Sequence, residues 1–156
     1  MKTTTNKKSG VIRAIALSLV LLMTLLTLAS CGGTLGSKGT LTLVLGTDDE
    51  PTIRVNLSKV SGDRGLLSVL DYLQMEERLT YKADASGFLT EVGPVKQDVA
   101  SGTYIYIWTS VEADFDVSEY ATTLEYDGKT LTSTGVGAKD MTIEDGAIIY
   151  IGTIEW

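Results

Sequence analysis

The side chains that could do chemistry in this chain are limited, because its 156 residues include no histidine and a single cysteine. The lack of histidine excludes triads with an imidazole base and most zinc, copper and haem sites. Neighbouring carboxylates occur at Asp48-Asp49 and Glu76-Glu77. The two carboxylates of a glycosidase must face each other across a cleft, and nothing in this spacing predicts such a cleft. We therefore expect that the protein is not an enzyme.

Two short motifs have features of ion or phosphate sites. Glu112, Asp114 and Asp116 place carboxylates at alternate positions, as in some calcium sites. They lack the twelve-residue loop with its glycine and bidentate glutamate, so a solvated acidic loop is the alternative that we favour. The segment GVGAK (135–139) lacks the spacing and ending of a phosphate-binding loop and is expected to be a connection between strands.

The amino-terminal segment has the three parts of a secretory signal peptide. Four cations and no acid precede an apolar run at 14–28, and small residues follow it. The run is shorter than the roughly 20 residues that span a bilayer, so a retained anchor helix is the weaker alternative. We expect residues 1–30 to be a lipoprotein signal peptide.

Cys31 is the single cysteine and lies at the exit of this signal. The stretch LASCG (28–32) resembles the bacterial lipobox, in which the thiol receives diacylglycerol and cleavage leaves the cysteine first. The alternative is a free or paired cysteine, but a disulfide within the chain would need a second cysteine. We expect a lipidated Cys31 that anchors the protein to the extracytoplasmic face of a bacterial cell membrane, at about 0.8 kcal/mol per buried CH₂.

The charge of the mature chain restricts its partners. Thirteen cations and 20 acids are present, and four of the cations lie in the signal, so nine cations remain and the net charge is about −11. This charge disfavours nucleic acid, whose binding depends on neutralising phosphates. It also keeps the domain away from an anionic membrane surface, so attachment depends on the lipid.

The rest of the chain predicts a tether and one folded domain. Residues 31–39 are rich in glycine, serine and threonine and form a flexible tether, and the domain spans 40–156. Alternating apolar residues predict strands at 40–47, 52–60, 87–92, 103–111 and 147–156, and a hairpin of two short strands at 124–132. Asp127-Gly128 and Asp145-Gly146 are typical of type I′ hairpin turns.

One helix is expected between 61 and 79. An apolar stripe with helical spacing predicts its buried face, formed by Leu66, Val69, Leu70 and Leu73. Ser61 or Asp63 can cap its start, and Ser68 is expected on the solvated side. The element order predicts an α+β fold, a β-grasp-like mixed sheet with one helix packed on one face.

Four segments of the chain resemble the DUF4430 family in their order and spacing: GDRGLLSVLDYLQ, ASGFLTEVGPV, GTYIYIWTS and LEYDGKTLTSTGVGAKDMTIEDGAIIYI. That family is similar to the carboxy-terminal β-domain of transcobalamin and intrinsic factor. The resemblance covers roughly 40–156. It implies a β-grasp-like fold on an extracellular lipoprotein, with cobalamin as the bound ligand. Transcobalamins add a helical domain on the other side of the corrin, for which this chain has no room.

An aromatic row gives an independent hypothesis about the site. Alternation along 103–111 places three aromatic side chains on one face: Tyr104, Tyr106 and Trp108. Ile105 and Ile107 share the opposite face, which suits the helix, and Tyr150 on the last strand can join the aromatic side. An open aromatic face would bind a planar ligand, a sugar ring or a partner protein. The alternative is that Trp108 packs under a loop such as 112–120, with tyrosines that only stabilise cross-strand pairs.

We therefore predict a membrane-anchored, non-catalytic binding domain that captures a corrinoid or similar small ligand. The alternative is a surface-displayed protein–protein interaction module without a small-molecule ligand.

Overall fold

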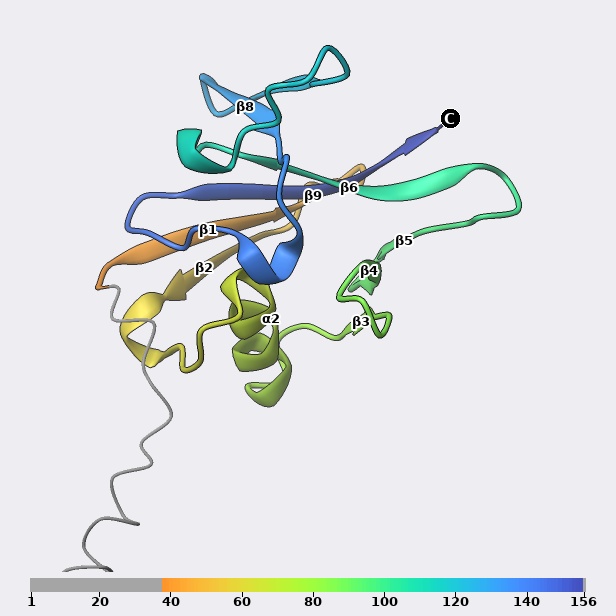
Figure 1. Cartoon of the computed structure of the whole chain (residues 1–156). Coiled ribbons are helices and arrows are strands. Elements are labelled where there is room, and N and C mark those ends of the chain that lie inside the picture. Colours follow the sequence, from red (N-terminus) through yellow and green to blue (C-terminus); the bar gives the residue numbers. More distant parts are fainter. Residues whose placement is uncertain (1–37, 156) are drawn as a thin grey trace, which may run out of the picture. The chain divides into compact units, whose positions relative to one another are not determined.

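The computed structural model describes residues 38–155 (Figure 1). The predicted signal peptide, Cys31 and most of the tether lie outside these residues. The described residues belong to one compact unit. Within that part of the chain, no helix is long and apolar enough to cross a membrane.

The main sheet has six strands in the order β2-β1-β9-β6-β8-β7. Their bounds are β1 Thr40–Leu45, β2 Thr52–Asn56, β6 Thr103–Thr109, β7 Thr123–Tyr126, β8 Lys129–Ser133 and β9 Ile148–Glu155. β1 and β9 pair in parallel, and the other neighbours pair antiparallel, so the sheet is mixed. The first and last strands therefore lie side by side in the interior of the sheet. Three short 3₁₀ helices complete the order: η1 Leu57–Lys59, η2 Glu112–Asp114 and η3 Ala138–Asp140.

One α-helix, α2 (Gly65–Met75), lies against one side of this sheet (Figure 1). The predicted stripe is buried, and Leu70 has no exposed surface. The predicted α+β class, with one helix on a mixed sheet, is confirmed.

Two details of the helix prediction are wrong. Arg64 is the N-cap residue and makes no side-chain cap, so neither Ser61 nor Asp63 has that role. Ser68 is buried rather than solvated, and its Oγ accepts a hydrogen bond from the Arg64 N–H at 2.9 Å. The hydroxyl thus satisfies a donor at the helix start from within the helix, because Gly62 leaves space beside it.

A second, three-stranded sheet was not expected as a unit. It contains β3 (Tyr81–Ala83), β4 (Leu89–Val92) and β5 (Val95–Lys96), all antiparallel. Only β4 falls within a predicted strand. β3 and β5 are too short to show alternation, so the sequence pattern does not reveal them.

The two predicted hairpin turns differ. Asp127 and Gly128 have φ of 49° and 72°, as a type I′ turn requires, and they join β7 to β8. The hairpin expected at Asp145-Gly146 is wrong, because no strand precedes it. There the Asp145 carboxylate accepts a hydrogen bond from the Thr40 N–H at 2.8 Å, and Gly146 N–H donates to the Thr40 carbonyl. This turn therefore joins the start of β1 to the start of β9.

Candidate functional site

The predicted aromatic row lies on the sheet face opposite α2. Trp108 packs with Val44, Leu131 and Ile148 in a cluster that contains no residue of α2, whereas Ile105 packs against the helix-side core. The predicted division of the strand between its two faces is confirmed.

The expected open floor is wrong, because Trp108 is only 8% exposed. Its indole N–H donates to Thr122 Oγ1 at 3.0 Å, and Leu131 of β8 packs beside it. The sheet continues past β6 into β8 and β7, and this hairpin closes over the ring. Trp108 is therefore a buried residue, as in the alternative interpretation of the row, but the hairpin rather than a loop such as 112–120 packs against it.

The tyrosines extend the aromatic cluster outward. Ring centroids lie 5.1 Å apart for Tyr106–Trp108, 5.9 Å for Trp108–Tyr150 and 6.0 Å for Tyr126–Tyr150, all edge to face. Tyr106 and Tyr150 are half-buried, and Tyr104 is 38% exposed. Of the predicted ligand-binding residues, the structure thus brings Tyr106, Trp108 and Tyr150 together.

Tyr150 is held at its outer end by a polar contact. Its hydroxyl donates to Glu50 Oε1 at 3.1 Å. Burial, and then the hydrogen bond to this carboxylate, raise the pKa of Tyr150 above its ordinary value. The ring fits because Gly46 has no side chain: a Cβ there would lie 2.5 Å from Tyr150 Cε1.

The acidic motif has a structural role. Asp114 is buried, and its two carboxylate oxygens accept hydrogen bonds from the backbone N–H and the hydroxyl of Thr142, at 2.7 and 2.8 Å. No group of three metal-ligating side chains occurs in residues 38–155. Asp114 therefore fixes the segment after η3 rather than leaving its oxygens free for a cation.

Two adjoining hollows lie elsewhere, around the turn between β3 and β4. One, of about 790 Å³, lies between the start of α2 and this turn. A second, of about 290 Å³, lies between the turn and η3. They share Ser86, Gly87 and Lys139, so they adjoin, and we call them together the turn groove.

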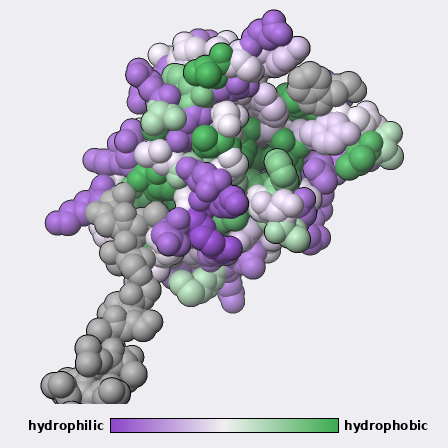
Figure 2. Space-filling view, in the orientation of Figure 1, coloured by the Kyte–Doolittle hydropathy of each residue, from purple (hydrophilic) through white to green (hydrophobic). Residues whose placement is uncertain are grey.

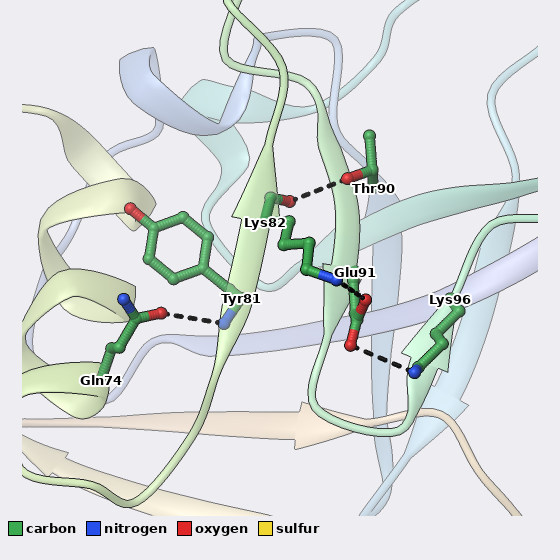
Figure 3. A network of polar contacts seen from close by, with 6 residues as sticks. All are labelled: Gln74, Tyr81, Lys82, Thr90, Glu91 and Lys96. Carbon is green, nitrogen blue, oxygen red and sulfur yellow. Dashed lines mark hydrogen bonds and ion pairs between the residues drawn. The ribbon is translucent and has the colours of Figure 1, made fainter.

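A polar network fixes the small sheet to the helix beside the turn groove (Figure 3). Gln74 Oε1 accepts a hydrogen bond from the Tyr81 N–H at 3.1 Å, and the Tyr81 hydroxyl donates to Asp71 Oδ1 at 2.5 Å. Asp71 also pairs with Arg64. Burial, and then the hydrogen bond to Asp71, raise the pKa of Tyr81. These contacts hold β3 at a fixed place along α2.

A second set of ion pairs stiffens the small sheet itself. Lys82 Nζ lies 2.8 Å from one carboxylate oxygen of Glu91, and Lys96 Nζ lies 3.1 Å from the other (Figure 3). Hydrogen bonding to Lys82 and then to Lys96 lowers the pKa of Glu91. Since both lysines are solvent-exposed, each pair contributes little to stability, but together they keep Lys82 at the wall of the turn groove.

The turn that divides the groove is built on Asp84. Its Oδ1 accepts hydrogen bonds from the N–H groups of Ser86 and Phe88, at 2.8 and 3.0 Å. Gly87 has φ of 88°, which a side chain would strain. This geometry holds the Phe88 ring outward, where it is 69% exposed.

The lining of the turn groove contains three cations, together with the carboxylates of Asp84 and Asp140. Arg64, Lys82 and Lys139 line it. Arg64 and Lys82 have carboxylate partners, whereas Lys139 has none among the described residues. The arrangement suits a small polar ligand with an anionic group. Sequence reasoning missed it because the lining comes from three separate segments, and only the Asp84–Gly87 turn gives a local signal.

No protein-family model and no curated protein matches the chain. Among solved structures, it is distantly similar to the crystal structure of a "putative metal binding protein" from Ruminococcus gnavus, with a TM-score of 0.46 and 14% sequence identity. That alignment covers 76% of this chain and 99% of the other.

Proposed function

We propose that this protein is a non-catalytic binding domain, held on the extracytoplasmic face of a bacterial membrane by lipid on Cys31, which captures a small polar ligand in the turn groove. The observation that carries the proposal is a hollow of about 790 Å³ with the unpaired ammonium of Lys139 at its wall. Small-molecule sites commonly measure about 300–1,000 Å³ and contain a few fixed polar groups.

A corrinoid is the ligand that the resemblance to the DUF4430 family favours. Its amide side chains and phosphate suit a groove with hydrogen-bonding groups and a free cation. The turn groove is open to solvent on one side, so it would cover only part of so large a macrocycle.

A visible-absorbance titration with cobalamin tests this proposal. We expect a saturable spectral change with the wild-type domain and at least severalfold weaker binding by Lys139→Ala, because the cation that faces the ligand is lost. Lys129→Ala removes a cation from the β7–β8 hairpin, away from the groove, and serves as the matched control. No spectral change with the wild type would exclude corrinoids, and equal affinities of the two variants would place the ligand elsewhere.

The anchor is tested separately by Cys31→Ser. A hydroxyl is too poor a nucleophile to replace the thiolate, so we expect an unprocessed precursor without diacylglycerol. Metabolic labelling with a radioactive fatty acid measures this directly. Acyl chains that remain attached to the variant would contradict the predicted lipidation.

A surface-displayed protein–protein interaction module is the second candidate function. The exposed side chains of Phe88 and Tyr104 favour it, since both are large; Phe88 lies beside β6, and Tyr104 belongs to that strand. In the space-filling view, apolar residues appear in several separate patches between hydrophilic ones (Figure 2).

A further inference from the structure

The Phe88 ring is an isolated apolar group at the turn groove. Its side chain is 69% exposed, and it lines the hollow of about 290 Å³ between the turn and η3. Among the described residues that line the turn groove, it is the one large apolar side chain that is exposed. A protein interface is marked by a continuous apolar patch, whereas a single ring among polar groups suits a small ligand.

The turn holds the backbone of Phe88 in place. The Phe88 N–H donates to Asp84 Oδ1 at 3.0 Å, and the Phe88 carbonyl accepts a hydrogen bond from the Asp84 N–H at 2.9 Å. A ring with two side-chain torsions on a fixed backbone loses little conformational entropy when a ligand stacks on it. The turn therefore presents Phe88 in a position that is already suitable for binding.

Lys139 lies beside the same turn and lines the same hollow. A Cβ on Gly87 would be 3.9 Å from Lys139 Cδ, so the aliphatic part of the lysine runs next to the residue that precedes Phe88. Within the described part of the chain, the Lys139 ammonium forms no ion pair. The hollow thus combines an exposed ring with a cation that has no carboxylate partner.

Asp140 adds a hydrogen-bond acceptor to this hollow. Its Oδ2 lies 3.8 Å from the place of a Cβ on Gly137, and its carboxylate has no side-chain or backbone donor among residues 38–155. An ionised carboxylate only accepts hydrogen bonds, so it suits a hydroxyl or amino group of a ligand and repels an anion. Asp140 and Lys139 therefore select different parts of one ligand.

The volume of the hollow limits the size of the group that it can hold. A cavity of about 150 Å³ holds benzene. The hollow of about 290 Å³ beside Phe88 therefore has room for a bicyclic ring. The adjoining hollow of about 790 Å³ has room for the rest of a larger ligand.

We propose that the turn groove binds a nucleotide, with its heteroaromatic ring stacked on Phe88, a sugar hydroxyl bonded to Asp140 and its phosphate on Lys139. Aromatic side chains stack on such rings, carboxylates accept hydrogen bonds from ribose hydroxyls, and lysine binds phosphate. This inference rests on the proposed function, names the chemical class of its ligand and makes Phe88 the residue that recognises the ring. A free nucleotide and the nucleotide part of a corrinoid share this chemistry.

Isothermal titration calorimetry of the whole chain in detergent tests the inference with three probes. They are adenosine 5′-monophosphate, adenosine, which lacks the phosphate, and ribose 5-phosphate, which lacks the ring. We expect the complete nucleotide to bind at least tenfold more tightly than either part, because only it can contact Phe88 and Lys139 together.

Two variants then assign each part of the nucleotide to its residue. Phe88→Ala should weaken binding of adenosine 5′-monophosphate at least fivefold and leave ribose 5-phosphate unchanged, because only stacking is lost. Lys139→Ala should weaken both phosphates and leave adenosine unchanged. Phe88→Tyr keeps the ring and should bind as the wild type does. Tyr104→Ala removes an exposed ring outside the groove and is the matched control.

Cobalamin and cobinamide, which lacks the nucleotide part, identify the source of the ring. Weaker binding of cobalamin but not of cobinamide by Phe88→Ala would assign the ring to a corrinoid. Binding of adenosine 5′-monophosphate without binding of cobalamin would assign it to a free nucleotide. Cobalamin binding that depends on Lys139 but not on Phe88 would overturn this inference and leave the proposed function in place. No binding of either cobalamin or adenosine 5′-monophosphate at millimolar concentration would overturn both.

Discussion

The two faces of the six-stranded sheet are closed in different ways. On the side of α2, the core is dominated by aliphatic side chains, and Leu70 and Ile149 are completely buried. On the other side, four buried residues lie among partly buried tyrosines and aliphatic side chains. A single helix covers only one face, and edge-to-face rings close the second without another layer. Such aromatic pairs contribute about 0.5–1.5 kcal/mol beyond the area that they bury.

The polar ends of the rings distinguish the aromatic face further. Tyr150 bonds Glu50, and the Tyr126 hydroxyl lies 2.9 Å from Thr52 Oγ1. The contacts tie the cluster to the turn between β1 and β2, at Glu50, and to the first residue of β2, Thr52. The aromatic face is therefore closed partly by hydrogen bonds at its rim, whereas the helix face is closed by apolar packing.

The largest expected effect tests whether the aromatic face is a true core. Trp108→Ala should lower the free energy of unfolding by about 3–5 kcal/mol, because it leaves a large cavity. Tyr104→Ala, on the same strand and face but exposed, is the matched control and should cost far less. Urea denaturation measures both. Similar small losses for the two variants would mean that Trp108 is not packed as described.

On the helix face, Leu70→Ala should cost about 2–5 kcal/mol through the same loss of packing. Met75 belongs to the same helix but is 74% exposed, so Met75→Ala provides the control and should be nearly neutral. If Leu70→Ala proved as mild as Met75→Ala in thermal or urea unfolding, the helix would not be the cover of this face.

A smaller effect is expected where the aromatic face has no spare room. The new Cβ in Gly46→Ala would lie 2.5 Å from Tyr150 Cε1 and 3.0 Å from the backbone Cα of Gly152. Overpacking of this kind costs about 1–3 kcal/mol. Gly128→Ala is a useful comparison, because nothing lies within 4 Å of a Cβ there and only its positive φ opposes the change. Native-like stability of Gly46→Ala would show that the ring moves freely.

The smallest effect concerns alkaline pH. The raised pKa of Tyr150 means that the folded state holds this proton more tightly than the unfolded chain does. Its contribution to stability is complete below the unfolded pKa of about 10 and is lost as the pH rises through the folded value. Urea denaturation from about pH 9 to about pH 11 should thus show that the free energy of unfolding falls less steeply with pH for Tyr150→Phe than for the wild type.

Tyr81 has a pKa raised in the same direction beside α2. Comparing Tyr81→Phe with Tyr150→Phe therefore shows how much of the stability lost at alkaline pH comes from each side of the sheet. Identical pH profiles for the wild type and both variants would contradict a role for either hydroxyl.

Much of this fold could be predicted because its signals are periodic. The alternation around Trp108 assigned both faces of β6, and the stripe through Leu70 assigned the buried face of α2. What failed depends on contacts across the chain. Ser68 is polar yet buried, because the orphan N–H of Arg64 lies within its reach. Trp108 is covered by a hairpin whose position the local pattern does not encode.

The candidate site was less predictable than the fold for the same reason. Lys139 and the Asp84 turn lie more than 50 positions apart in the chain and meet only after folding. Neither residue has a neighbouring motif that indicates a ligand. The aromatic row could be recognised in the sequence because its members alternate on one strand. The alternation shows that they share a face of the sheet, but it does not show whether that face is buried or exposed.

The parallel pairing of β1 with β9 has a consequence for the order in which the chain can fold. Thr40 and Asp145, joined by a hydrogen bond, are 105 positions apart. Contacts of such long range carry a large loop-closure entropy and slow the folding reaction. During synthesis, β1 and β2 emerge first and can form only a two-stranded ribbon, which is marginal alone. The central seam of the sheet therefore forms only after β9 has been made.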